Sequence, residues 1–250
     1  HILPHGTPTD LPTYAFQRQR FWLEPVRSGK GDVRHSGLVP AEHPWLSAVL
    51  ALAGGEGHLL TGRLSLTEHP WLRDHAVLGS VLVPGTGLLG VALAAARAVG
   101  AARVGELTLA QPLVLTEDTP LRIQVKVGAS DDGHRPIGIY SQPETTADPD
   151  SWTVHATGHL ADDEQDVRPD GLAELRNWPV SGAEPLSLDG FYDTLAGQGL
   201  EYGPVFRSLT GLARRGNVAY GRVVLPEAEH DSADAFGIHP ALLDAALHAL

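Results

Sequence analysis

Cysteine is absent from this chain of 250 residues, and lysine occurs only twice, at Lys30 and Lys126. Without cysteine the chain can form neither a disulfide nor a thiolate metal site. Acidic residues outnumber basic ones by 30 to 18, which gives a formal net charge of −12. Nucleic-acid binding requires a basic surface. The composition therefore predicts that nucleic acid is not a partner.

Long apolar runs are also absent, since a membrane-spanning helix needs about 20 consecutive apolar residues. The longest candidate, GLLGVALAAARAVG over residues 87–100, is interrupted by Arg97 and instead predicts a buried helix. The N-terminal 20 residues do not show the charged segment followed by an apolar one that is typical of a signal peptide. We therefore expect no membrane span and a cytoplasmic location.

The spacing of the 13 histidines gives little support for a metal site. The chain has no HExxH motif, and His155 and His159 fall in a segment that predicts a strand, where residues four apart simply share a face. The GTGLLG segment over residues 85–90 has the form of a GxGxxG fingerprint but no acidic partner in a β-α-β context. We expect neither a bound metal nor a dinucleotide.

Alternation of apolar with other residues predicts several strands in the first two thirds of the chain. These strand-like segments are residues 58–66, 105–115, 121–129, 135–142 and 151–161. Between the first two of these segments, residues 85–99 predict a helix that is apolar on nearly every face and ends at Gly100. A long helix wrapped by an antiparallel sheet would account for burial on all sides.

The last third of the chain predicts strands and a second apolar helix in the same order. A helix followed by a loop is expected over residues 187–209, and a strand pair with a turn near Gly216–Asn217 is expected over residues 210–226. The segment GIHPALLDAALHAL, residues 237–250, predicts the second apolar helix, with Pro240 near its first turn.

His75 and Asp244 are the candidates for chemistry, because each lies beside one of the two apolar helices. Apolar neighbours would desolvate the carboxyl group of Asp244 and favour its protonated form. His248 lies four residues after Asp244 and shares its helical face. A protonated acid opposite a histidine in an apolar segment is the pair needed to remove a carbon-bound proton and to protonate a departing oxygen.

Structural roles for these residues stay open on spacing alone. A histidine in an apolar segment is often a core residue bonded to the backbone, and an aspartate near a helix start often caps it. Asp244 and His248 also have the spacing of an ordinary pair on one helix face.

Motifs in three places, in order along the chain, resemble those of the dehydratase domain of modular type I polyketide synthases. HAVLGSVLVP fits HxxxGxxxxP, LEYGPVF carries YGPxF, and HPALLDAALH fits HPALLDxxxQ/H. The motif residues are His75, Gly79, Pro84, Tyr202, Gly203, Pro204, Phe206, Asp244 and His248. The segment LPTYAFQRQRFWL, residues 11–23, is similar to the one that leads out of the acyltransferase linker in such synthases.

The resemblance implies an α+β double hotdog fold, in which two antiparallel sheets each wrap round a long central helix. The corresponding division of the chain is a linker from the preceding acyltransferase region over residues 1–40, the first hotdog over 41–165, an inter-hotdog linker over 166–185, and the second hotdog over 186–250. Family members continue with further strands, so we expect the second hotdog to be incomplete in this sequence.

The resemblance also implies a reaction, the dehydration of a (3R)-3-hydroxyacyl thioester to the 2-enoyl thioester during polyketide chain extension. His75 would abstract the α-proton, and Asp244 would protonate the β-hydroxyl as water leaves. His248 would orient Asp244 or the leaving hydroxyl, and the backbone N–H groups at Gly85 would face the thioester carbonyl. The residues expected to shape the site are Gly79, Pro84, Tyr202, Gly203, Pro204 and Phe206, with Gly79 and Pro84 bending the segment so that His75 faces the other half.

No cofactor is expected, because the substrate would arrive on the phosphopantetheine arm of an acyl carrier protein, where tethering replaces tight free binding. The implied partners are that carrier protein, neighbouring synthase domains and a second copy of the chain in a homodimer. Two alternatives stay open. The same fold can isomerise a double bond or cyclise the tethered chain, and a non-catalytic hotdog can serve only as a dimer spacer.

Overall fold

The computed structural model describes residues 37–146, 148, 150–163 and 172–250. The acyltransferase-like segment at residues 11–23 lies outside the described residues, as does nearly all of the linker expected over 1–40. The chain divides into two compact units, His1–Gly31 and Asp32–Leu250, and every described residue belongs to the second.

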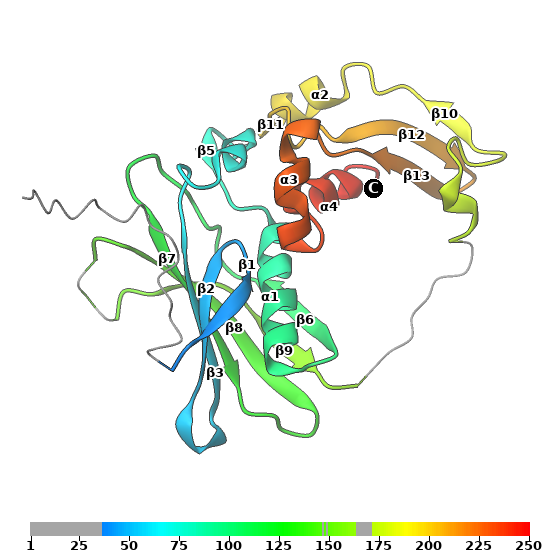
Figure 1. The fold of residues 1–250 in the computed structure, drawn as a ribbon. Helices are drawn as coiled ribbons and strands as arrows, with labels where there is room; N and C mark the ends of the chain where they lie inside the picture. The colour runs from blue at the N-terminus through cyan, green and yellow to red at the C-terminus, as the bar shows by residue number, and fades with distance from the viewer. Residues whose placement is uncertain (1–36, 147, 149, 164–171) are drawn as a thin grey trace, which may run out of the picture. The chain divides into compact units, whose positions relative to one another are not determined.

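Within the described part of the chain, seven strands form an antiparallel sheet in the order β1-β2-β3-β7-β8-β9-β6 (Figure 1). The strands are β1 Val39–His43, β2 Leu46–Ala51, β3 Gly57–Leu64, β6 Arg103–Leu109, β7 Leu121–Gly128, β8 His134–Pro143 and β9 Thr153–Ala161. The alternation that predicts β7 is also its burial pattern, since Leu121, Ile123, Val125 and Val127 are buried while the residues between them are not. The predicted strands at β3, β7, β8 and β9 are confirmed, whereas β1 and β2 are additional.

The strand expected over residues 105–115 is correct only as far as Leu109. Ala110 still donates its N–H to the backbone oxygen of His155 in β9 (2.8 Å), but the backbone then leaves the sheet and bonds to the segment that precedes the first helix. Val83 donates its N–H to the carbonyl of Leu113 (2.9 Å), and Leu115 donates its N–H to that of Val81 (2.9 Å). Leu113 and Leu115 are buried there. Their apolar side chains therefore fill the core from a connecting segment rather than from a strand.

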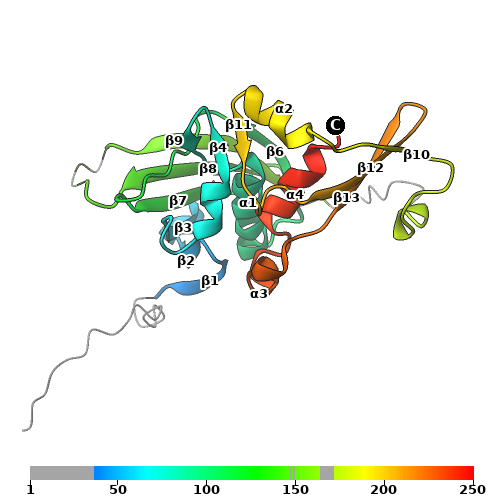
Figure 2. The same cartoon turned by 90° about the horizontal axis from the view of Figure 1, so that it is seen from above.

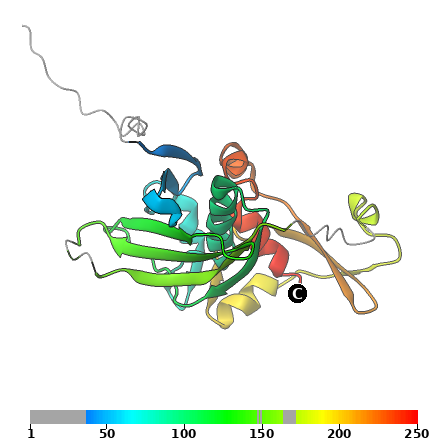
Figure 3. The ribbon, with the colours of Figure 1, turned by 90° about the horizontal axis from the view of Figure 1, so that it is seen from below.

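Helix α1, Gly85–Val99, lies along one face of this sheet (Figure 3) and contacts β1, β6, β7 and β8. No residue of α1 before Arg97 is exposed, which confirms the predicted burial on every side. The close packing depends on small residues, because a Cβ added at Gly87 would lie 2.5 Å from the ring of Trp45. Gly100 ends the helix in the left-handed conformation (φ 72°), as expected.

A second sheet, in the order β10-β12-β13, is formed by Glu184–Leu186, Leu209–Arg215 and Val218–Val223. The predicted turn at Gly216–Asn217 is confirmed, since Arg215 and Val218 are opposite each other in the ladder. Helix α2 is Phe191–Gly197, α3 is His230–Ala233, and α4, Pro240–Leu247, begins at the expected proline. Helix α4 packs against α1 and β13 (Figure 2). Strand β10 spans the boundary expected between the inter-hotdog linker (166–185) and the second hotdog (186–250).

A small sheet joins the two halves of the chain. It has the order β11-β4-β5, where β4 is His75–Val77, β5 is Ser80–Val81 and β11 is Leu200–Tyr202. The β4–β5 turn is Leu78–Gly79, in which both residues have positive φ (50° and 74°), the conformation that a two-residue hairpin turn requires. Among the described residues, no helix is both long and apolar enough to span a bilayer.

Candidate active site

His75 follows a 3₁₀ helix, Pro70–Asp74, and begins strand β4, with 8% of its surface exposed. Its Nδ1 lies 2.9 Å from the backbone oxygen of Leu82. A carbonyl oxygen can only accept, so Nδ1 carries the proton of the neutral ring and Nε2 keeps its lone pair. This bond to the Leu82 carbonyl is the kind that a structural histidine makes. It also leaves the Nε2 lone pair free, as a base requires.

Burial lowers the pKa of His75 below its usual value of 6.5, an effect that the negative charge of Asp244 and the bond to Leu82 partly oppose. His75 is therefore neutral at neutral pH, which is the form that a proton acceptor needs.

Strand β11 brings the YGPxF motif to His75, because Tyr202 lies directly opposite His75 in the β4–β11 ladder. The ring centroid of His75 is 5.6 Å from that of Tyr202 and 5.0 Å from that of the fully buried Phe206. Burial, followed by the charge of Asp244 and the neighbouring Tyr192, raises the pKa of Tyr202 to about 12. Its hydroxyl therefore remains a hydrogen-bond donor at neutral pH.

The carboxylate of Asp74 holds this motif in place and was not singled out from the sequence. Its Oδ2 accepts the N–H of Val205 (2.8 Å), and its backbone oxygen accepts the N–H of Gly203 (2.8 Å). A Cβ at Gly203 would lie 2.4 Å from Cγ of Asp74, so only glycine allows this approach. Pro204, between the two donors, is exposed. No local pattern could identify Asp74, because its partner lies 131 residues away.

Asp244 and His248 project from α4 and its C-terminal cap, with side chains 13% and 7% exposed. Asp244 Oδ2 and His248 Nε2 are 3.3 Å apart, but neither atom has a hydrogen-bond partner among the described residues. The His248 ring lies 4.4 Å from that of Tyr202, which also contacts His75. Tyr202 thus connects the two candidate groups.

The first turns of α1 and α4 are tied together, since Thr86 donates its hydroxyl to the backbone oxygen of Pro240 (3.0 Å). This bond keeps Asp244 on the side of the molecule where α1 begins. Pro84 is buried and precedes α1, and Gly85 is its first residue, where backbone N–H groups have no intrahelical acceptor. The structure therefore gathers His75, Tyr202, Phe206, Asp244 and His248.

Gly79 does not bend the segment towards the second half, as the sequence had led us to expect. It lies in the exposed β4–β5 turn, where an added Cβ would meet nothing within 4 Å, and the pairing of β4 with β11 is what turns His75 towards that half.

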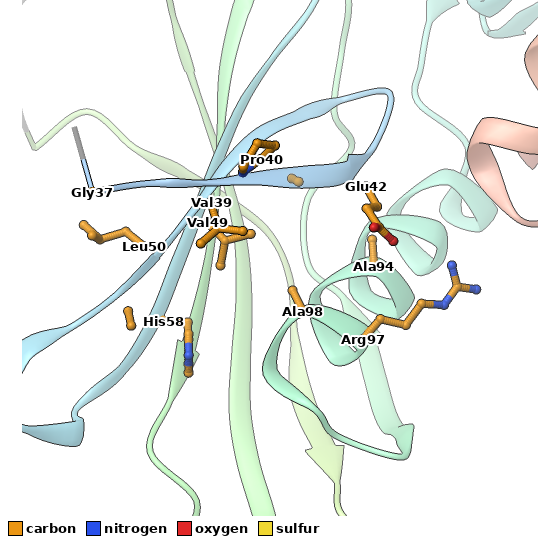
Figure 4. Close-up of a pocket in the computed structure, with 12 residues that line it drawn as sticks. Gly37, Val39, Pro40, Glu42, Val49, Leu50, His58, Ala94, Arg97 and Ala98 are labelled. Carbon is orange, nitrogen blue, oxygen red and sulfur yellow. The ribbon is translucent and has the colours of Figure 1, made fainter. Parts of the chain in front are cut away.

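Two pockets lie near these elements. One, of about 210 Å³, is lined by Val83, Gly85, Leu88 and residues 109–113, beside the start of α1. The other, of about 430 Å³, lies between the β1–β2 hairpin and the last turns of α1, and Val39, Val49 and Arg97 are among its lining residues (Figure 4). None of the predicted site residues lines this second pocket. Within the described ranges, no group of three or more His, Asp and Glu side chains is arranged to hold a metal ion.

Family models match most of the chain. The one described as polyketide synthase dehydratase domain matches residues 43–142, and the one described as polyketide synthase dehydratase N-terminal domain matches residues 173–250. Polyketide synthase GfsA of Streptomyces halstedii is 51% identical over 252 residues, which cover 100% of this chain. The chain spans only 3% of that protein's length.

Solved structures resemble the chain over most of their own length. The dehydratase domain from the terminal module of the rifamycin polyketide synthase is 41% identical with a TM-score of 0.79, covering 87% of this chain and 78% of that one. The bifunctional dehydratase-cyclase domain in ambruticin biosynthesis is 42% identical with a TM-score of 0.78, covering 86% and 77%.

Proposed function

Because the chain belongs to the polyketide synthase dehydratase family, we propose that it removes water from a (3R)-3-hydroxyacyl thioester to give the 2-enoyl thioester. The substrate is carried on the phosphopantetheine arm of an acyl carrier protein. The observation that carries the proposal is the placement of His75, a buried histidine whose Nδ1 lies 2.9 Å from the backbone oxygen of Leu82 and whose ring contacts Tyr202. The same tyrosine ring contacts His248, which lies beside Asp244.

In this reaction the lone pair on Nε2 of His75 takes the proton from the α-carbon. The electrons of that C–H bond form the double bond, the bond between the β-carbon and oxygen breaks, and Asp244 gives its proton to the departing oxygen. Hydroxide is a poor leaving group, so the acid is needed as much as the base. One water leaves. Exchange with solvent then removes the proton that His75 gained and returns a proton to Asp244.

The surroundings of the two groups support these roles. Tyr202 and Phe206 pack against His75, and their apolar rings limit the access of water that would compete for its Nε2 lone pair. Negative charge develops on the thioester oxygen as the α-proton leaves, and the first N–H groups of α1 at Gly85 are suited to stabilise it by donating hydrogen bonds to that oxygen. The pocket of about 210 Å³ beside Gly85 is lined mainly by apolar residues, with Gln111 among them, and offers room for part of the acyl chain.

The proposed partners are the acyl carrier protein, the neighbouring domains of a synthase and a second copy of the chain. The proposal requires no cofactor beyond the phosphopantetheine arm of the carrier protein. The similarity to the ambruticin dehydratase-cyclase favours one second candidate, cyclisation of the tethered chain after dehydration. A dimer spacer requires neither His75 nor Asp244, so their enclosure in one site argues against that alternative.

Mass spectrometry of the carrier-bound intermediate tests the proposal. The natural polypeptide that carries this chain, given a (3R)-3-hydroxyacyl carrier protein, should decrease the mass on the arm by one water. His75→Ala and Asp244→Asn should each abolish the loss while the protein stays folded. An unchanged mass with a β-hydroxyacyl chain of the natural length would refute dehydration, and conversion of an enoyl substrate at constant mass would indicate isomerisation or cyclisation.

A further inference from the structure

Tyr192 lies on α2, outside all three motifs, yet its hydroxyl reaches the site. The oxygen is 3.4 Å from Nδ1 of His248 and 3.3 Å from the backbone nitrogen of Leu209 at the start of β12. Its ring packs edge-on to the rings of His248 (5.7 Å between centroids) and Tyr202 (6.3 Å). The side chain is half-buried, and the guanidinium of Arg207 covers its ring at 5.5 Å.

The direction of these two hydrogen bonds follows from what each group can do. The Leu209 N–H can only donate, so it uses a lone pair of the Tyr192 oxygen. The phenol keeps its single proton, which it can donate to Nδ1 of His248 when that nitrogen is unprotonated. In a neutral ring, an unprotonated Nδ1 places the proton on Nε2. Nε2 lies 3.3 Å from Oδ2 of Asp244, close to it but without the alignment of a hydrogen bond in this structure.

The other tautomer of His248 would work against the reaction. A bare Nε2 would accept the proton of Asp244 and hold it away from the substrate. With Nε2–H, by contrast, Oδ2 of Asp244 accepts, and the acidic proton is left on Oδ1 for the departing hydroxyl. Because a hydrogen bond to a carboxylate is stronger than one to a carboxylic acid, the same N–H also stabilises Asp244 after it has given up its proton.

We propose that Tyr192 is a positioning residue, which holds His248 in the Nε2–H tautomer so that this N–H is available to Asp244 when Asp244 gives up its proton. This inference rests on the dehydratase function proposed above. It concerns the efficiency of proton donation rather than substrate binding, so it predicts an effect on kcat and not on KM.

A double-mutant cycle in the natural polypeptide tests the proposal, with water loss from a 3-hydroxyacyl carrier protein as the assay. Tyr192→Phe, which keeps the ring contacts, should lower kcat about tenfold at unchanged KM, the effect of losing one hydrogen bond that acts in the transition state. His248→Leu removes the group on which Tyr192 acts. In that background Tyr192→Phe should change kcat less than about twofold. Tyr220→Phe is the matched control. The Tyr220 hydroxyl accepts a hydrogen bond from Arg215 in the β10-β12-β13 sheet, so its removal should leave kcat unchanged.

Equal losses from Tyr192→Phe in both backgrounds would overturn the proposal, because a merely structural role through Leu209 does not depend on residue 248. A rise in KM without a fall in kcat would do the same. If Tyr192→Phe does not fold, the kcat of His248→Gln, compared with that of His248→Leu, tests the proposal instead. Its carboxamide accepts from Tyr192 and donates to Asp244, so it should recover most of the kcat that His248→Leu loses. Equal activity of the two His248 variants overturns the proposal, whereas an inactive unsubstituted protein refutes the dehydratase function itself.

Discussion

Removal of the Asp74 carboxylate is the substitution whose effect the structure specifies most fully. Asp74 precedes His75 and accepts the N–H of Val205 at 2.8 Å, so it links the element that carries the proposed base to the loop that carries Tyr202 and Phe206. Asp74→Ala leaves the Val205 N–H without this acceptor. Asp74→Asn keeps an oxygen there but removes its charge.

The magnitude follows from the type of bond. A hydrogen bond to a charged group contributes about 1.5–3 kcal/mol, and a neutral one about 1 kcal/mol. We therefore expect Asp74→Ala to lower the free energy of unfolding by about 2 kcal/mol, and Asp74→Asn by about half as much. For a domain of this size, about 2 kcal/mol corresponds to a decrease of about 4–8 °C in Tm.

Thermal unfolding of the isolated dehydratase domain, the form in which the rifamycin relative was crystallised, measures this effect. Glu117→Gln is the control, because Glu117 is an exposed carboxylate bonded to Arg73, the residue just before Asp74, and its loss should leave Tm nearly unchanged. The water-loss assay should show kcat falling in the order of the Tm values. A Tm for Asp74→Ala equal to that of the unsubstituted domain, or a Tm for Asp74→Asn as low as that for Asp74→Ala, would refute the reasoning.

Two further predictions concern pH. Burial holds the pKa of His75 below 6.5. We therefore expect kcat/KM to stay constant as pH falls from neutral to 6.5 and to decline only below 6.5, where His75 becomes protonated. A decline of kcat/KM centred at pH 7 or above would contradict this prediction. His239, 2% exposed, has its pKa lowered by burial to about 4, so the folded state binds fewer protons than the unfolded one as pH falls from 6.5 to 4. Its contribution to stability is complete above pH 6.5, and about 3 kcal/mol is lost by pH 4. His239→Asn, which keeps an acceptor for the Ala241 N–H, should flatten denaturant-measured stability over that range, and an unchanged slope would rule out His239 as the cause.

Much of the fold was predictable because its signals are local. The alternation in β7 gives one buried and one outward face, and the small apolar residues of α1 with Gly100 after them give a helix buried on all sides. The motifs around His75, Tyr202 and Asp244 could likewise be found by comparison of short stretches. These features depend on neighbours a few residues apart, which the order of amino acids specifies directly.

The tertiary structure alone decided how those pieces meet. The β4–β11 pairing places Tyr202 opposite His75, and the bond from Thr86 to Pro240 aligns the two helices. Residues 113–115 failed as part of the predicted strand because their backbone partners are at 81–83 rather than in the sheet. Asp74 and Tyr192 gave no signal in the sequence, since an aspartate or a tyrosine acquires its role only from the donor or acceptor that folding brings within about 3 Å. The candidate acid and base were therefore readable in the sequence, whereas the contacts that hold them in working order exist only once distant segments are packed together.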